Sequence, residues 1–104
     1  MVSKTEELKL ATDAYDKFAN KLKEATDAKS KLNSVTQADE WKKQQKIIND
    51  SSSGMEKART YASELASELQ TDRESIYGFT DEGKILASTI DGSLSSYSAW
   101  ADSL

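Results

Sequence analysis

Apolar side chains recur at intervals of three and four residues along the first third of the chain. The stripe consists of Leu8, Ala11, Tyr15, Phe18, Leu22, Ala25 and Leu32. Lysines and acids occupy most positions between them, as on an amphipathic helix with one solvated face. We therefore expect a helix over about 4–33 that ends at Asn33 and Ser34.

A second helix is predicted over about 37–77, after a short connection. Thr36 is a favourable N-cap, and Asp39 and Glu40 supply the acidic first turn that the helix dipole favours. Because the connection is short, the two helices should form a long antiparallel hairpin.

The second helix carries an apolar repeat of seven residues, formed by Trp41, Ile48, Met55, Ala62, Leu69 and Ile76. A sustained repeat of this kind predicts coiled-coil-like packing. The sequence NDSSSG at 49–54 reads locally as a turn, but the repeat continues on both sides of it. This favours a continuous helix that is weakened at 49–54. We expect the hairpin core to contain Phe18, Leu22, Leu65 and Leu69.

A third, C-terminal helix is predicted over about 81–102, with Thr80 as its N-cap and an acidic first turn at Asp81 and Glu82. The seven-residue repeat continues here at Gly83, Ile90, Tyr97 and Leu104. A helix unbroken from residue 37 would approach ~100 Å, which is too long for a small domain, so we expect a break. The apolar stripe of this helix would contain Leu86 or Ala87, together with Ile90, Leu94, Tyr97 and Ala101.

The composition of this third segment is unusual for a helix. Six of the final 17 residues are serine, and Gly92 lies among them. Both residue types are poor helix formers, so burial must hold the helix. Tyr97 and Trp100 are also costly to leave in water, so this face should pack on the molecule's own hairpin or on another chain.

Composition is consistent with a single all-α domain over residues 1–104. There is no proline, and 37% hydrophobic residues against 31% charged ones imply a narrow apolar surface. The net charge of −4 is uneven: residues 1–48 hold 10 basic and 8 acidic side chains, and residues 49–104 hold 4 and 10. An acidic chain without a concentrated basic face argues against nucleic-acid binding.

Enzyme chemistry finds no support in the residue types. Without histidine or cysteine, the chain lacks the commonest general base and every thiolate. Carboxylate pairs such as Asp39 and Glu40 read as helix caps or solvated charges. We therefore expect no enzymatic activity and no cofactor or metal. The first residues, MVSKTEELKL, lack the apolar core of a signal peptide and no run approaches a membrane span, so we expect a soluble protein without a cleavable leader.

Two places invite a functional interpretation. Trp41 either caps the core near the hairpin turn or projects into a partner's groove. The stretch SIYGFTDEG at 75–83 either ends one helix and starts the next or is a signal that another protein reads.

Trp41 and this stretch together give a resemblance. A short, acidic helical hairpin with a tryptophan near its turn resembles the WXG family of bacterial type VII secretion. The family's Trp-Xaa-Gly falls on Trp41, Lys42 and Lys43, so the tryptophan matches and the glycine does not. The family's export signal, Tyr-Xaa-Xaa-Xaa-Asp/Glu, falls on Tyr77 to Asp81. Helical partners of LXG toxins would tolerate Lys43 better.

The resemblance implies a non-enzymatic binding protein of a type VII secretion system: a secreted substrate, a chaperone or a targeting partner of a larger effector. The alternative is a helical-bundle adaptor unrelated to secretion. We expect a helical protein partner in a homodimer or heterodimer, extending to a secreted toxin and the secretion ATPase, and a cytoplasmic location before export. Tyr77 and Asp81 are the export-signal candidates. The partner-interface candidates are Trp41, Ile48, Met55, Phe79, Leu94, Tyr97 and Trp100.

Overall fold

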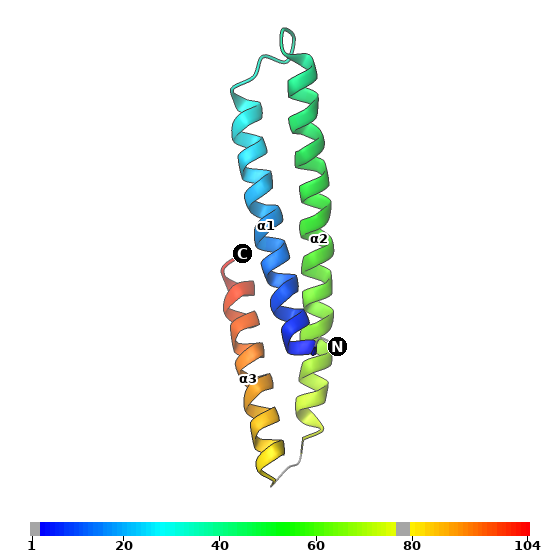
Figure 1. Ribbon diagram of the computed structural model, residues 1–104, viewed down its shortest axis with the longest axis vertical. Helices are drawn as coiled ribbons and strands as arrows, with labels where there is room; N and C mark the ends of the chain where they lie inside the picture. Colours follow the sequence, from blue (N-terminus) through cyan, green and yellow to red (C-terminus); the bar gives the residue numbers. More distant parts are fainter. Residues whose placement is uncertain (1–2, 77–79) are drawn as a thin grey trace. The chain divides into compact units, whose positions relative to one another are not determined.

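The computed structural model describes residues 3–76 and 80–104, and these residues form three helices. The helices are α1 (Lys4–Ser30), α2 (Ala38–Glu74) and α3 (Asp81–Asp102). α1 and α2 form a helical hairpin to which α3 is added as a third helix (Figure 1). The predicted fold class, an all-α hairpin with a third C-terminal helix, is confirmed.

Side-chain caps define the first residues of α1 and α3. The hydroxyl oxygen of Ser3 accepts a hydrogen bond from the backbone N–H of Glu6 at 3.3 Å. Thr80 has extended backbone angles, and its hydroxyl oxygen accepts from the N–H of Gly83 at 3.1 Å. The predicted N-cap of the third helix is therefore confirmed. Each cap satisfies a donor that the first helical turn leaves unpaired.

The turn between α1 and α2 differs from the expectation. α1 ends at residue 30 instead of 33, and α2 begins at residue 38 instead of 37. The side-chain oxygen of Asn33 accepts from the N–H groups of Val35 and Thr36, at 2.8 and 3.0 Å, and the Gln37 side chain accepts from the Asn33 N–H. Asn33 thus organises a turn before α2, and Thr36, which we expected to be the N-cap, lies two residues before the first helical residue. We predicted a helix end at Asn33 and Ser34, and the hydrogen bonds of the Asn33 side chain stabilise a turn there in place of a further helical turn.

The helices divide into two compact units. The hairpin unit comprises residues 13–58, and the three-helix unit comprises residues 1–12 and 59–104. α1 and α2 each contribute a segment to both units, whereas α3 belongs to the three-helix unit alone. The core of each unit can therefore be described separately.

The three-helix unit holds a continuous apolar core. Its buried members are Leu8, Ala11, Ala62, Leu65, Ala66, Leu69 and Ile90. Ile76, Leu94, Tyr97 and Trp100 pack against them and are partly buried. α3 runs alongside the other two helices within this unit (Figure 1), and its Ile90 belongs to the same buried cluster as Leu8 of α1 and Leu69 of α2. Of the two residues proposed for the start of the α3 stripe, Ala87 is half-buried and Leu86 is 53% exposed, so Ala87 is the inward-facing one.

The hairpin unit packs two helices through smaller residues. Ala25 of α1 and Ser51 of α2 are buried, at 3% exposure each. A Cβ atom built on Gly54 would lie 2.7 Å from two atoms of the Phe18 ring, so the ring sits directly on the glycine backbone. Segment 49–54, the predicted weak place, is helical throughout. The small residues that weaken it also give Phe18 room to pack.

Phe18 and Leu22 were expected to be buried like Leu65 and Leu69, and for the first two this is wrong. Leu65 and Leu69 are 4% and 2% exposed, whereas Phe18 and Leu22 are only half-buried. The physical reason is the number of helices around each residue. Two helices cannot enclose a large side chain on all sides, but the third helix of the three-helix unit completes the enclosure.

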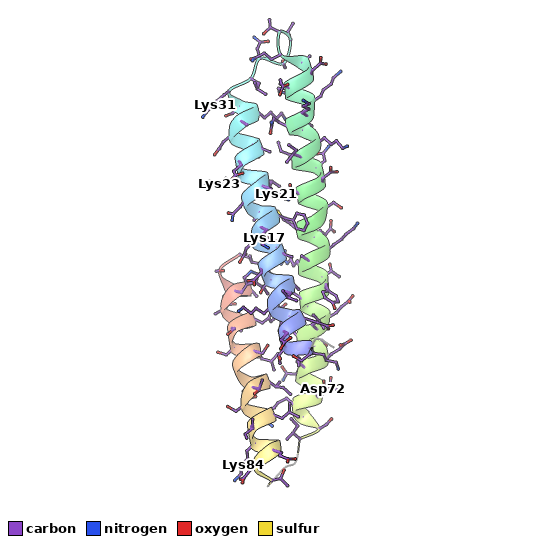
Figure 2. All side chains as sticks on the ribbon, viewed as in Figure 1. Lys17, Lys21, Lys23, Lys31, Asp72 and Lys84 are labelled. Atoms are coloured by element: carbon purple, nitrogen blue, oxygen red, sulfur yellow. The ribbon has the colours of Figure 1, made fainter. Side chains whose placement is uncertain are left out.

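The exposed faces carry the charges. In the hairpin unit, Lys17, Lys21, Lys23 and Lys31 are all exposed. Figure 2 shows Lys23 and Lys31 pointing away from α2. This is the solvated face that the spacing of apolar and polar residues predicts.

Truncating Leu65 should test the core. Leu65→Ala should lower the free energy of unfolding by ~2–5 kcal/mol, because it removes a buried side chain and leaves a cavity. Leu86→Ala is the matched control and should change it by less than ~0.5 kcal/mol, because Leu86 faces solvent. Urea unfolding followed by circular dichroism measures both. Equal losses in the two variants would contradict the assigned faces.

Two of the helical glycines, Gly54 and Gly92, should respond in opposite directions to alanine. Nothing lies within 4 Å of a Cβ atom on Gly92, so Gly92→Ala should stabilise the fold by ~0.5–1 kcal/mol through better helix propensity. Gly54→Ala should destabilise it by ~1–3 kcal/mol, because the new methyl group displaces the Phe18 ring. Adding Phe18→Leu should recover part of that loss. Stabilisation by both alanines alike would contradict the close contact.

Candidate functional site

Trp41 is held by contacts with its own chain. It lies near the start of α2, and its side chain is half-buried. The ammonium group of Lys29 lies 4.3 Å from the centroid of the Trp41 ring and also donates a hydrogen bond to the Gln45 side chain. A cation over an aromatic face contributes ~0.5–1 kcal/mol at an exposed site. The tryptophan therefore ties α1 to α2 near the hairpin turn, and one ring face is occupied.

The other interface candidates on α2 lie along the same seam. Ile48 and Met55 are half-buried in the hairpin unit. They follow Trp41 at intervals of seven residues and are neither enclosed nor fully exposed. Tyr77 and Phe79 lie outside the described residues.

The apolar face of α3 packs on the chain's own helices. Leu94, Tyr97 and Trp100 are partly buried against the core of the three-helix unit. The rings of Tyr97 and Trp100 have centroids 5.7 Å apart and planes tilted by 33°. This spacing is typical of a favourable aromatic pair. Of the two sequence-based explanations for this face, the molecule's own hairpin is the one the structure supports.

Asp81 is exposed in the first turn of α3. The preceding residue, Thr80, caps the helix, so the fold does not need the Asp81 carboxylate for that hydrogen bond. The charge of Asp81 still complements the positive end of the helix dipole. The carboxylate of Asp81, one of the two export-signal candidates, is therefore accessible to a partner.

Sequence reasoning missed an apolar neighbour of this carboxylate. Ile85 is 67% exposed and lies four residues after Asp81, so the two side chains share one face of α3. Leu86 is also exposed. The signal was available in the run ILA at 85–87, because three consecutive apolar residues on a helix cannot all face one core.

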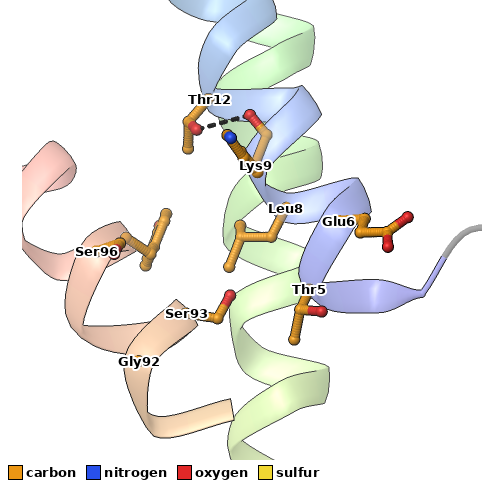
Figure 3. Close-up of a pocket in the computed structure, with 9 residues that line it drawn as sticks. Thr5, Glu6, Leu8, Lys9, Thr12, Gly92, Ser93 and Ser96 are labelled. Atoms are coloured by element: carbon orange, nitrogen blue, oxygen red, sulfur yellow. Dashed lines mark hydrogen bonds between the residues drawn. The ribbon is translucent and has the colours of Figure 1, made fainter. Parts of the chain in front are cut away.

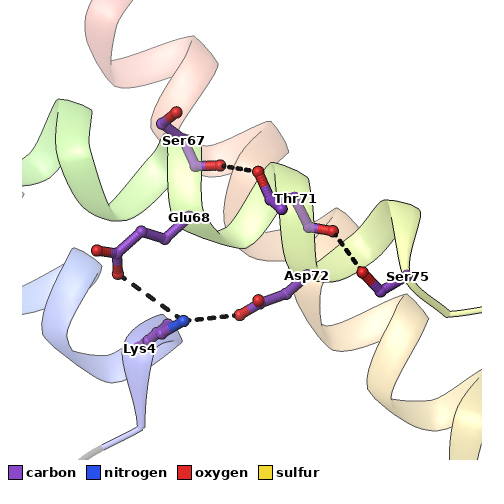
Figure 4. Close-up of polar contacts among 6 residues, drawn as sticks. All are labelled: Lys4, Ser67, Glu68, Thr71, Asp72 and Ser75. Atoms are coloured by element: carbon purple, nitrogen blue, oxygen red, sulfur yellow. Dashed lines mark hydrogen bonds and ion pairs between the residues drawn. The ribbon is translucent and has the colours of Figure 1, made fainter.

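A small charge cluster lies between α1 and α2 within the three-helix unit. The ammonium group of Lys4 lies 2.9 Å from a carboxylate oxygen of Asp72 and 3.8 Å from one of Glu68 (Figure 4). The hydrogen bond to Asp72, aided by the charges of both carboxylates, raises the pKa of Lys4 despite a partial loss of hydration. Among the described residues, no group of carboxylates is arranged to hold a metal ion.

Tyr61 lies on the same unit and is 46% exposed. Partial desolvation is the largest cause that raises its pKa, followed by the negative charge of Glu7 and a hydrogen bond to that carboxylate. A tyrosine held neutral by a neighbouring acid is a hydrogen-bond donor, not a nucleophile.

A shallow pocket of about 290 Å³ opens between α1 and α3 in the three-helix unit (Figure 3). Its lining consists of Thr5, Glu6, Leu8, Lys9, Thr12, Gly92, Ser93, Ser96 and Tyr97. The hydroxyl of Thr12 donates to the backbone carbonyl of Lys9 at 2.9 Å. On the α3 side the lining includes the small residues Gly92, Ser93 and Ser96.

Comparisons with known proteins place this geometry in no family. No family model matches the chain, and neither does any curated protein or solved structure. Within the described part of the chain, no helix is both long enough and apolar enough to cross a membrane.

The stability of the fold should fall at alkaline pH. The folded state raises the pKa of Tyr61 above 10.0 and that of Lys4 above 10.5. The stability that these groups contribute is complete below those unfolded values and is lost as pH rises through the folded ones. Urea midpoints should therefore fall more steeply above about pH 10 in the wild type than in the double variant Tyr61→Phe, Lys4→Met. Parallel falls in both proteins would assign the loss to other groups.

Proposed function

We propose that this chain is a non-enzymatic binding protein of a bacterial type VII secretion system. It acts as a secreted substrate, a chaperone or a targeting partner of a larger effector. Its partner is a helical protein, in a homodimer or heterodimer, and the wider assembly includes a secreted toxin and the secretion ATPase. The protein resides in the cytoplasm before export.

The observation that carries this proposal is the exposed pair of Asp81 and Ile85 at the start of α3. The carboxylate falls at the acidic position of the export motif, and Thr80 relieves it of the capping role. An apolar side chain one turn away adds area that a partner can desolvate. Binding energy concentrated in a few such groups suits recognition by another protein.

A helical-bundle adaptor unrelated to secretion is the second candidate. Two observations favour it. Lys43 occupies the position of the motif glycine, and the ring of Trp41 is covered on one face by Lys29. In this interpretation Trp41 serves the hairpin, and partners contact the half-buried seam through Ile48 and Met55.

Export and folding can be separated at the start of α3. Asp81→Asn removes the charge and should cost at most ~0.3–1 kcal/mol of stability, because a surface charge at a helix N-terminus contributes that much. Under the proposal it should abolish export from a type VII-competent strain, as should Tyr77→Ala. Ile85→Ser should reduce export while leaving helicity intact. The exported fraction is measured by immunoblot of culture supernatant beside circular dichroism of the purified protein.

Thr80→Ala is the matched control, since it removes the cap and leaves the motif residues in place. It should lower the stability by ~0.5–2 kcal/mol and still permit export. Normal export of both Asp81→Asn and Tyr77→Ala would remove the basis for the secretion proposal and favour the adaptor.

A further inference from the structure

The chain contains three asparagines, and the structure places them in different surroundings. Asn20 lies within α1 and Asn49 within α2, whereas Asn33 lies in the turn between these two helices. All three residues are exposed. Asn33 is followed by Ser34, whose side chain is small and uncharged, whereas charged residues follow the other two. Asn33 therefore differs from the others both in its backbone and in its neighbour.

A helix protects an asparagine from attack by its own backbone. The backbone nitrogen of the next residue donates to the carbonyl four residues back, and helical backbone angles do not allow the five-membered ring that such an attack forms. The side chain of Asn49 also accepts a hydrogen bond from Gln45 at 2.8 Å. Asn20 and Asn49 can therefore react only when their helix opens locally.

Asn33 lies outside both helices, and its side-chain carbonyl is polarised. The Oδ1 atom accepts hydrogen bonds from the N–H groups of Val35 and Thr36, at 2.8 and 3.0 Å. Two donors on one carbonyl oxygen make the Cγ atom more electrophilic and stabilise the negative charge that develops on the oxygen during attack at that carbon. Ser34 is exposed and small, so its side chain gives little shielding to the peptide bond between the two residues.

From this turn, we propose that Asn33 is a site of spontaneous deamidation, at which water converts the side-chain amide to a carboxylate. The backbone nitrogen of Ser34 loses its proton to hydroxide and bonds to Cγ of Asn33. The Cγ–Nδ2 bond breaks, and the nitrogen takes a proton from water and leaves as ammonia. Water then opens the succinimide ring at either carbonyl, which gives aspartate or isoaspartate. The reaction needs water alone and regenerates the hydroxide.

The two products differ in their effect on the turn. Aspartate keeps an acceptor in the same place, and its charge strengthens the hydrogen bonds from Val35 and Thr36. Isoaspartate adds a methylene group to the main chain, so the two hydrogen bonds cannot both keep their geometry. Deamidation thus adds one negative charge and produces one form with an intact turn and one with a loosened turn. The proposal does not rest on the secretion function.

Peptide mapping by mass spectrometry tests the proposal on the full chain. One sample is kept folded in a mildly alkaline buffer, and a second is kept unfolded in urea. In the folded sample, the peptide that contains Asn33 should be deamidated more than about tenfold faster than those that contain Asn20 or Asn49, because the helices must open first. In urea the difference should shrink to what the following residue causes.

Two variants separate the neighbouring residue from the turn. Ser34→Gly should speed the loss of the Asn33 amide, because it removes the remaining shielding of the attacking nitrogen. The matched control is Lys21→Gly, which gives the helical Asn20 the same neighbour. Asn20 should still react more slowly in this folded variant than Asn33 does in the wild type, since α1 protects it.

The product also has a measurable effect on stability. Asn33→Asp should keep the urea midpoint of the wild type or raise it, whereas the isoaspartate fraction, separated by chromatography, should have a lower midpoint. Equal rates at the three asparagines in the folded protein would overturn the proposal. So would an Asn33 peptide that is modified in urea but not in the folded protein, because the turn would then be protective. Faster loss at Asn20 in Lys21→Gly than at Asn33 in the wild type would assign the reaction to the neighbour alone.

Discussion

The structure depends on the burial of a narrow apolar seam where three helices meet. Ala62 and Leu69 of α2 are almost fully buried there, and Leu8 of α1 and Ile90 of α3 pack against the same cluster. Burial of apolar area is the largest favourable contribution to folding, and small side chains such as alanine let helices approach closely. With so much charged and polar surface, the chain has few other places where such burial is possible. The serine-rich α3 is helical because this seam stabilises it.

Polar contacts contribute little to the free energy of unfolding, but they influence where the helices begin and how they align. The Lys4–Asp72 and Arg73–Asp91 pairs lie at the edges of the three-helix unit and are partly exposed. Exposed pairs of this kind contribute little free energy, but they penalise alternative alignments that bring like charges together. The caps at Ser3 and Thr80 act similarly, because each satisfies a backbone donor at one particular residue. These two caps help to determine where α1 and α3 start.

A helical hairpin serves many functions, so the functional proposals rest on individual side chains. Trp41, which the sequence suggested as a partner contact, has an intramolecular cation on one face. Asp81 keeps an exposed carboxylate, and the structure adds Ile85 beside it. Asp81 and Ile85 at the start of α3 are therefore more accessible than Trp41 near the hairpin turn.

By itself, the sequence determined the number of helices, their order and the cap of the third helix. Periodicity and capping are local properties, set by residues within a turn or two of each other. Only the tertiary structure decided that Asn33 organises the hairpin turn, that Ala87 and not Leu86 faces inward, and that Phe18 packs on the Gly54 backbone. Spacing along one helix cannot reveal whether two or three helices surround a side chain. Leu65 is buried because three helices surround it, whereas Phe18 lies between two helices and is half-buried.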